Sequence, residues 1–184
     1  MILPGSTIGI LGNGQLGRMT ALAARAMGYH VAVEPPDPTH PAGQVADRSM
    51  SEAKVLTFEF ENVKAFKTHC LVRPSFEVLH ITQNRLREKT WVRDHGIPGT
   101  PFTPILNVED LDRCSFPGVL KTADSGYDGK GQSKVHSLQE AREAFTGQPS
   151  VLESLIDFRR EVSVIAARSE DRSFAHYGVM ENAH

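Results

Sequence analysis

Cysteine is scarce in this chain of 184 residues, which contains only two. Cys70 and Cys114 lie far apart and outside any C-x-x-C spacing, so they form neither a disulfide framework nor a thiolate metal motif. The chain also lacks a secretory start, and none of its apolar runs approaches the length of a membrane span. These absences predict a soluble protein of the reducing cytoplasm with no membrane partner.

An excess of positive charge is missing as well. The formal net charge is −2, so nothing predicts attraction to a nucleic-acid backbone. Apolar residues make up 40% of the chain and charged residues 23%, which is the usual balance of a globular protein. The chain has no internal repeat and no low-complexity tract.

The first part of the chain predicts a parallel α/β unit. Residues 7–11 form a short apolar run that ends in glycines, as in a buried parallel strand. Further strands are expected at 30–34, 55–60 and 71–74. A helix is expected after the first strand, because five apolar residues fall on one helical face: Leu16, Met19, Ala23, Ala26 and Met27. A cluster of prolines predicts an extended surface loop over 35–48.

The pattern changes beyond residue 74. Ser75 can cap a short helix, and a longer helix is expected from Thr82 to His95. Residues 97–104 are rich in proline and predict a stiff connector at a domain boundary. Short helices are expected to begin at Asn107 and after a capping box of Ser137 and Glu140. Strands are expected at 118–122, 133–136, 150–153 and 161–168.

A first glycine motif, residues 12–17, matches G-x-G-x-x-G between the first strand and the first helix. Glycine permits the tight turn, and the helix N-terminus offers free N–H groups to a phosphate. Glu34 ends the second strand, where a dinucleotide-binding protein holds a ribose. By itself the motif is compatible with a nicotinamide cofactor, with a phosphate-bearing substrate and with a turn that binds nothing.

A second glycine motif, within residues 123–132, is more specific. Gly126, Gly129 and Gly131 predict a hairpin loop whose backbone N–H groups can wrap a polyphosphate. Lys121 and Lys130 supply positive charge for its oxygens. The spacing is not that of a P-loop. We therefore predict that the loop binds ATP, the alternative being a surface hairpin with incidental charge.

Two segments downstream fit the same interpretation. Residues 151–156 predict a strand that runs into a turn, and such a strand end can present backbone groups to an adenine edge. Glu161 begins the next strand, where a carboxylate can hold ribose hydroxyls. The alternative for Glu153 and Glu161 is ordinary surface charge.

Five blocks of sequence carry a resemblance to a known family. They are Gly-x-Gly-Gln-Leu-Gly-Arg-Met (12–19), Phe-Glu-Phe-Glu-Asn-Val (58–63), Arg-Pro-Ser (73–75), Gln-Asn-Arg-Leu-x-Glu-Lys (83–89) and Gly-Tyr-Asp-Gly-Lys-Gly-Gln (126–132). The chain resembles the N5-carboxyaminoimidazole ribonucleotide synthetase family of the ATP-grasp superfamily, which acts in purine biosynthesis. The likeness covers essentially the whole chain, since residues 161–165 and 181–184 extend it.

The resemblance implies an ATP-dependent ligase. ATP and bicarbonate form carboxyphosphate, which carboxylates the exocyclic amine of 5-aminoimidazole ribonucleotide and leaves ADP and phosphate. This chemistry needs positioning, charge neutralisation and exclusion of water, so no catalytic side chain is assigned. The first glycine turn then belongs to a pre-ATP-grasp domain that does not bind NAD, and the match at Glu34 becomes a coincidence.

The family's site residues carry over by position. The implied ATP-binding residues are Arg85, Lys121, Gly126, Tyr127, Asp128, Gly129, Lys130, Gly131, Gln132, Glu153, Ser154, Leu155, Ile156, Glu161 and His184. The implied residues for the aminoimidazole substrate are Gln15, Leu16, Glu61, Tyr127 and Asp128. Arg85 and Lys121 are expected at the phosphates, residues 126–132 as a closing lid, residues 153–156 at the adenine and Glu161 at the ribose.

The implied fold is an α/β ATP-grasp fold in three parts. A Rossmann-like pre-ATP-grasp domain with a linker helix is expected over 1–97, a lid domain over 98–160 and the start of an incomplete C-terminal ATP-grasp domain over 161–184. The family also implies a homodimer. Within the superfamily, formate-dependent glycinamide ribonucleotide transformylase shares this layout, but Gln15 and the Tyr127–Asp128 pair favour the carboxylating ligase. A nicotinamide-dependent oxidoreductase and a non-catalytic nucleotide-binding module are the alternatives from other classes.

The chain departs from the family in length. Family members are much longer, and the resemblance places the ligands of Mg²⁺ beyond residue 184, so no metal ligand is expected within this chain. The connections between the first strands are short, because the family carries more residues near 48–55 and 62–70. We therefore expect an incomplete chain, which an intact mass of 20.2 kDa would contradict. Its strand at 161–168 is expected to lack sheet partners.

Overall fold

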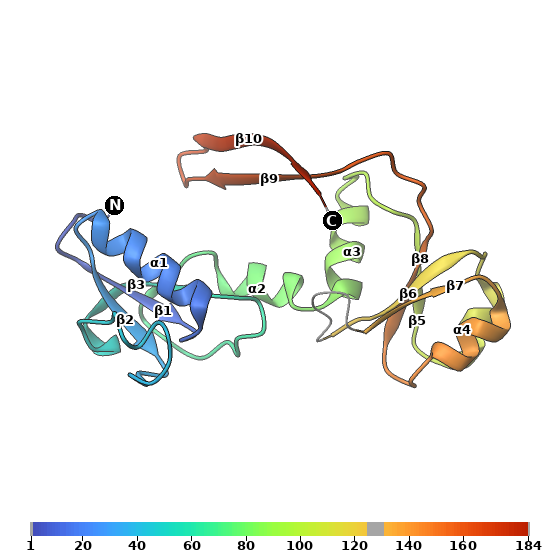
Figure 1. The fold of residues 1–184 in the computed structure, drawn as a ribbon, viewed down its shortest axis with the longest axis horizontal. Coiled ribbons are helices and arrows are strands. Elements are labelled where there is room, and N and C mark those ends of the chain that lie inside the picture. The colour runs from blue at the N-terminus through green and yellow to red at the C-terminus, as the bar shows by residue number, and fades with distance from the viewer. Residues whose placement is uncertain (1, 125–130, 184) are drawn as a thin grey trace.

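The computed structural model describes residues 2–124 and 131–183. Its helices and strands form three groups along the chain, each with its own β-sheet (Figure 1). Two four-stranded sheets lie at opposite ends of the molecule, with helices α2 (Phe76–Thr82) and α3 (Arg85–Asp94) between them. The predicted α/β class is confirmed.

The first sheet is parallel, with the strand order β2-β1-β3-β4. Its strands are β1 (Thr7–Leu11), β2 (His30–Glu34), β3 (Ala53–Phe58) and β4 (Leu71–Val72). All four lie where the sequence predicts strands, although β3 begins and ends two residues earlier than expected and β4 ends two residues earlier. The apolar run of β1 occupies the interior of the sheet and is mostly buried, as its composition indicates.

Helix α1 (Gln15–Ala26) lies at the predicted place but turns an unexpected face to the sheet. Gly17, Ala21 and Ala24 are buried, whereas Leu16 and Met19 are 56% and 59% exposed. All five residues of the apolar face identified from the sequence are exposed. Small side chains let the helix approach the strands closely, and the side chains of the strands fill the core beneath it. The apolar periodicity located the helix, but close packing against the strands buries the face that carries small side chains.

Residues 35–48 form the predicted loop. Between β2 and β3, a stretch that the structure describes in full, the only helical element is the 3₁₀ turn η1 (Met50–Glu52). Polar contacts fasten the loop to the sheet: Asp47 accepts the N–H of Val31 at 2.8 Å, and its second oxygen lies 2.8 Å from Nδ1 of His30. Arg25 of α1 donates to the carbonyl of Val45 at 2.7 Å. Hydrogen bonds therefore hold a connection that has no crossover helix.

Helices α2 and α3 differ from the single long helix expected from Thr82 to His95. Ser75 caps α2 as predicted, accepting the N–H of Val78 at 3.3 Å. The chain then leaves the helical conformation at Asn84, whose side chain accepts the N–H of Arg87 at 3.0 Å and begins α3. The expected helix was wrong at its start, because an asparagine between helical residues does not reveal whether it caps a helix or continues one.

The second sheet is antiparallel, with the strand order β5-β8-β6-β7. Its strands are β5 (Phe102–Ile105), β6 (Gly118–Thr122), β7 (Gln132–Val135) and β8 (Ser150–Ser154). The predicted connector at 97–104 is wrong in its last residues, which belong to β5. Pro104 is tolerated there because β5 is an edge strand, where a missing N–H breaks no ladder on the open side.

The helical turn η2 (Val108–Arg113) and helix α4 (Leu138–Ala144) pack on this second sheet around Ile105, Leu111 and Leu120. Both begin where the sequence predicts. The capping box before α4 is only half formed: Ser137 accepts the N–H of Glu140 at 3.2 Å, but the carboxylate of Glu140 accepts the N–H of His136 at 2.9 Å.

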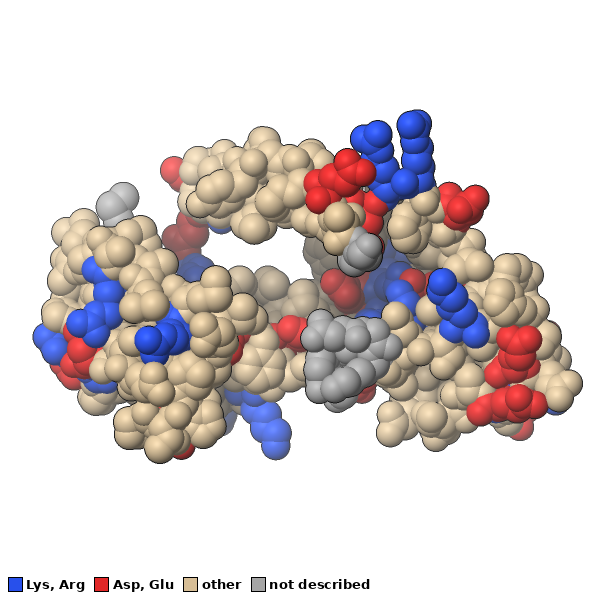
Figure 2. Space-filling model, in the orientation of Figure 1, with Lys and Arg blue, Asp and Glu red and all other residues tan. Residues whose placement is uncertain are grey.

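A hairpin of β9 (Glu161–Arg168) and β10 (Phe174–Asn182) completes the described chain. The sequence predicted β9 but not β10, and the expectation that β9 lacks a partner is wrong, because the two strands pair antiparallel. Every residue of β9 is exposed. Figure 2 shows an opening between the hairpin and the body of the molecule, with acidic and basic side chains interspersed over this face. None of the described helices is long and apolar enough to cross a membrane.

Candidate functional site

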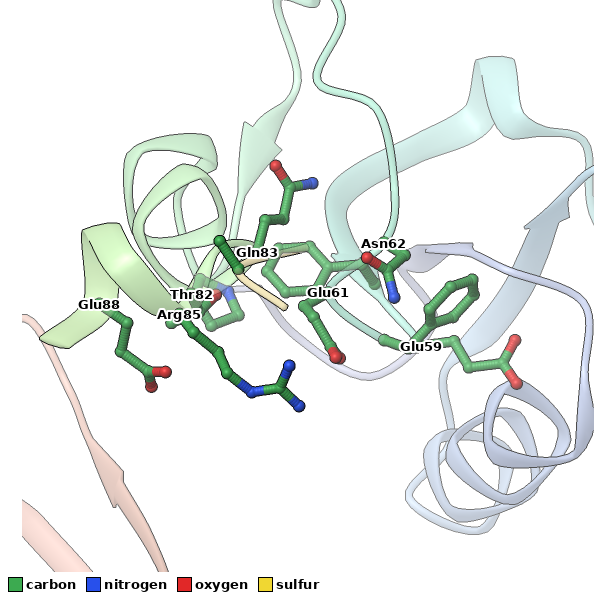
Figure 3. A pocket seen from close by; sticks show the side chains of 11 residues that line it. Glu59, Glu61, Asn62, Thr82, Gln83, Arg85 and Glu88 are labelled. Atoms are coloured by element: carbon green, nitrogen blue, oxygen red, sulfur yellow. The ribbon is translucent and has the colours of Figure 1, made fainter. Parts of the chain in front are cut away.

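A cavity of about 620 Å³ lies where β3 ends and α3 begins, and we call it the β3 cavity. Its charged and amide lining residues are Glu59, Glu61, Asn62, Gln83, Arg85 and Glu88. In Figure 3, the side chains of Glu61 and Arg85 point toward the same space from the loop after β3 and from the start of α3. Within the described chain, carboxylates outnumber cations in this lining. The β3 cavity therefore suits a ligand rich in hydrogen-bond donors better than a polyanion.

Glu59 fills the first glycine turn. Its Oε2 accepts the N–H of Gly14 at 2.8 Å, at the N-terminus of α1. A Cβ added at Gly12 would lie 2.5 Å from that oxygen, so the glycines leave room for a carboxylate. Figure 3 shows Glu59 pointing toward α1 and away from Glu61. A dinucleotide phosphate would meet a negative charge already in its place, which removes the physical support for a nicotinamide cofactor.

A larger cavity of about 1010 Å³ lies along β6, β7 and the end of β8, and we call it the β6 cavity. Lys121 pairs with Gln132 across the sheet and Val119 pairs with Lys134, so these four side chains share one face. Leu155, Ile156 and Phe158 add an apolar wall, and Glu161 lies at the start of β9. Lysines, an apolar wall and a carboxylate are the groups that phosphates, a base and ribose hydroxyls require.

Glu153 is the buried carboxylate of the β6 cavity, with 8% of the residue exposed. Lys121 donates to its Oε2 at 2.9 Å, and Nζ of Lys89 lies 3.1 Å from its Oε1. Burial alone would raise the pKa of Glu153, but the hydrogen bonds and charges of Lys121 and Lys89 outweigh it and lower this pKa below its usual value. Glu153 is therefore charged near neutral pH and holds two lysines from different elements.

The β6 cavity brings together seven of the predicted ATP-binding residues: Lys121, Gln132, Glu153, Ser154, Leu155, Ile156 and Glu161. Gly131 lies just before β7 with φ +70°, and its carbonyl accepts the N–H of Thr122 at 2.9 Å. Six predicted residues lie outside the described part of the chain: Gly126, Tyr127, Asp128, Gly129, Lys130 and His184.

Arg85 lies apart from the other predicted ATP-binding residues. It lines the β3 cavity, and its guanidinium donates to the carbonyl of Thr122 at 2.7 Å, so it supports the end of β6 next to Lys121. Glu61 lines the same cavity. Gln15 and Leu16, which were predicted on the substrate side, are exposed on α1 and do not line either cavity.

Sequence reasoning missed Glu59, Lys89 and Lys134. Counting by twos along a strand from Gln132 would have placed Lys134 on the same face. Glu59 and Lys89 belong to the quoted blocks 58–63 and 83–89, but their partners are distant in sequence and no local pattern points to them. Among the described residues, no group of three or more His, Cys, Asp or Glu is arranged to hold a metal ion. The Mg²⁺ site stays a prediction.

Models of two protein families match the chain. The ATP-grasp domain matches residues 90–184, and the ribonucleotide synthetase preATP-grasp domain matches residues 5–83. The chain belongs to the ATP-grasp family. The first sheet lies within the preATP-grasp match, while the second sheet and the hairpin lie within the ATP-grasp match. The predicted fold is confirmed.

The chain is similar to ATP-grasp proteins named N5-carboxyaminoimidazole ribonucleotide synthase. It is 39% identical to that of Brucella melitensis, over 98% of this chain and 58% of the relative, and 35% identical to that of Bacillus subtilis, over 100% and 55%. A crystal structure of an N5-carboxyaminoimidazole ribonucleotide synthetase in complex with ADP matches with a TM-score of 0.90 and 38% identity, over 100% of this chain and 56% of that one. The Staphylococcus aureus N5-carboxyaminoimidazole synthetase with ADP matches with a TM-score of 0.91 and 29% identity, over the same shares. The predicted family resemblance is confirmed.

The chain spans little more than half the length of these ATP-grasp relatives. The alignment with the Brucella melitensis protein covers 210 positions, more than the 184 residues of the chain. That relative therefore carries residues inside the matched region that this chain lacks.

Proposed function

We propose that the protein carboxylates 5-aminoimidazole ribonucleotide with bicarbonate and ATP, yielding N5-carboxyaminoimidazole ribonucleotide, ADP and phosphate in purine biosynthesis. The observation that carries this proposal is the similarity to N5-carboxyaminoimidazole ribonucleotide synthases along the whole chain, in sequence and in fold. The β6 cavity supports it, because its lysines and apolar wall suit a nucleotide, and solved structures of similar fold are described as complexes with ADP.

The proposed chemistry has two displacement steps. An oxygen of bicarbonate attacks the γ-phosphorus of ATP, the bond to the ADP oxygen breaks, and carboxyphosphate forms. The exocyclic amine then attacks the carbonyl carbon, phosphate leaves with the electrons of the C–O bond, and the amine loses a proton. The protein's task is to orient the reactants, neutralise phosphate charge and exclude water.

We place ATP in the β6 cavity. Lys121 faces the phosphates, Leu155 and Ile156 contact the adenine, and Glu161 holds the ribose. These assignments are supported by the shared face of β6 and β7 and by the apolar wall after β8. Gln132, Ser154 and Gly131 lie beside these groups, whereas Arg85, residues 126–130 and His184 enter the proposed ATP site through the resemblance alone.

We place the aminoimidazole ring and ribose of the ribonucleotide in the β3 cavity, with its phosphate outside the acidic part of the lining. Its ribose hydroxyls and exocyclic amine are hydrogen-bond donors, and Glu61 offers a carboxylate that points into this space. Tyr127 and Asp128 are proposed to reach the same substrate from the glycine loop. Gln15 and Leu16 are retained in the proposal on the resemblance only.

The remaining proposals concern the assembled protein. Mg²⁺ accompanies ATP, with ligands outside this chain, and bicarbonate is the second small substrate. A homodimer is supported by the exposed apolar residues of α1. A cytoplasmic location is supported by Cys70 and Cys114, which are free thiols. Three domains with boundaries at 97/98 and 160/161 are supported by the separate sheets.

The test is an ADP-release assay on the complete protein that the gene encodes. ATP, Mg²⁺ and bicarbonate are supplied with and without aminoimidazole ribonucleotide, and ADP is followed by a coupled assay. We expect ADP release that requires both bicarbonate and the ribonucleotide, with N5-carboxyaminoimidazole ribonucleotide as the product. ADP release that instead requires formate and glycinamide ribonucleotide would assign the protein to the transformylases. Binding of NADH without binding of ATP would overturn the proposal.

A further inference from the structure

Three charged side chains from different elements meet between the second sheet and α3. Oε1 of Glu153 on β8 lies 3.1 Å from Nζ of Lys89 on α3, and Oε2 lies 2.9 Å from Nζ of Lys121 on β6. The side chain of Glu153 is 10% exposed, that of Lys89 21% and that of Lys121 24%. One buried carboxylate therefore carries two ion pairs, and the three groups together have a net positive charge.

Lys89 reaches Glu153 from α3 and belongs to a different cavity. It lines a neighbouring cavity of about 720 Å³ together with Val92, Ile97 and Phe102, and it is not among the residues that line the β6 cavity. Its ammonium group also lies 5.7 Å from the centre of the Phe102 ring. Any effect of Lys89 on a ligand of the β6 cavity would therefore pass through Glu153.

The charge balance explains why a second lysine is needed there. If Glu153 had Lys121 alone, the pair would be neutral, and turning Lys121 toward a phosphate would leave a buried carboxylate without a partner, which is strongly unfavourable. With Lys89 in place, Glu153 keeps one ion pair whichever way Lys121 turns. The net positive charge of the cluster then becomes available to the ligand.

We propose that Lys89 is a positioning residue of the nucleotide site, which neutralises Glu153 and so frees Lys121 to bind polyphosphate. The proposal rests on the placement of ATP in the β6 cavity. It adds a residue of the linker helix α3 to a site otherwise formed by the second sheet and its loops. A rearrangement of α3 relative to that sheet would then change the affinity for ATP.

The test measures the affinity of the full chain for ATP by titration calorimetry. We expect Lys89→Met to weaken binding about tenfold, which is at the lower end of the effect of a lost charged contact. Lys89→Arg keeps the charge within reach of Glu153 and is expected to retain most of the affinity. Arg93→Met is the matched control, because Arg93 lies one turn away on α3, 5.6 Å from the same Phe102 ring, and pairs with Asp94. This control is expected to leave ATP binding unchanged.

A second background separates positioning from a purely structural role. Glu153→Gln removes the charge that Lys89 compensates, so Lys89→Met in that background is expected to leave ATP affinity unchanged. Equal losses in both backgrounds would show that Lys89 merely supports the fold, and would overturn the inference. So would unchanged affinity of the single Lys89→Met variant. Absence of ATP binding by the unsubstituted chain would instead overturn the proposed function, and the inference with it.

Discussion

Alanine substitutions at Gly12 and Gly14 test how Glu59 shapes the first glycine turn. An added Cβ at Gly14 would collide with a carboxylate oxygen of Glu59, but the backbone of Gly14, at φ −81°, suits any residue. Gly12 has φ +121°, and its Cβ would lie 2.6 Å from the Cβ of Glu59. We therefore expect crowding alone at Gly14, and crowding together with backbone strain at Gly12.

The magnitudes follow from these two causes. A Cβ at Gly14 meets only the carboxylate of Glu59, which can turn aside but then loses its hydrogen bond from the N–H of Gly14. Gly14→Ala is therefore expected to lower the free energy of unfolding by about 1.5–3 kcal/mol. Gly12→Ala adds about 1–2 kcal/mol for a positive φ. Glu59→Ala alone costs about 1.5–3 kcal/mol, because the N–H of Gly14 loses a charged acceptor. In the Glu59→Ala background, Gly14→Ala is expected to cost only about 0.5 kcal/mol, the preference for glycine over alanine as an N-cap.

The assay is urea unfolding of the single and double variants, followed by far-UV circular dichroism. We expect Gly14→Ala to couple to Glu59→Ala by about 1 kcal/mol or more, since the side chains are in contact. Gly12→Ala is the internal control, because about 1–2 kcal/mol of its cost is backbone strain that removal of Glu59 does not relieve. Equal costs of Gly14→Ala with and without Glu59 would refute the conclusion that the carboxylate of Glu59 occupies this turn.

Three further predictions concern other parts of the chain. Lys121→Ala is expected to weaken ATP binding about 10- to 150-fold, because a charged phosphate contact is worth about 1.5–3 kcal/mol; unchanged affinity in calorimetry would remove Lys121 from the site. Ala21→Leu should cost about 1–3 kcal/mol in urea unfolding, since Ala21 is fully buried, while Met19→Ala on the exposed face should stay within about 0.5 kcal/mol; the opposite order would contradict the packing of α1. Burial opposes a low pKa at Asp47, but hydrogen bonds from His30 and the backbone prevail and lower this pKa from 3.8. Its stabilisation is therefore complete above about pH 4 and lost as the pH falls through the lower folded value, and Asp47→Asn should flatten the pH dependence of the unfolding midpoint there.

Much of the fold was predictable from local patterns. Short apolar runs located the strands of the first sheet, and helix caps such as Ser75 and Ser137 located helix starts. The errors fall where tertiary position decides. Pro104 argued against a strand, yet it lies on an edge where proline is tolerated. The large apolar residues of α1 indicated its buried face, yet only the smaller face fits against the strands.

In the candidate site, too, local patterns located some residues, and tertiary position determined the others. The lysine and apolar residues of the β6 cavity follow one another along β6, β7 and the end of β8, so the glycine spacing located Lys121 and the predicted strand end located residues 153–156. Glu153 was predicted beside the adenine, and that prediction did not include the two lysines with which its carboxylate pairs. Lys89 on α3 contributes one of these contacts, and no pattern within either segment shows that they meet.

The two glycine motifs show why a motif alone did not decide the function. Both offer backbone N–H groups that could bind an anion. In the first, β3 delivers Glu59 to the N–H of Gly14, so a phosphate is excluded by charge and by space. The second follows a strand that carries Lys121, and Lys89 balances the carboxylate that would otherwise hold that lysine. Side chains from distant segments therefore make the first turn unfavourable for an anion, and on our proposal they leave Lys121, on the strand before the second motif, free to bind one.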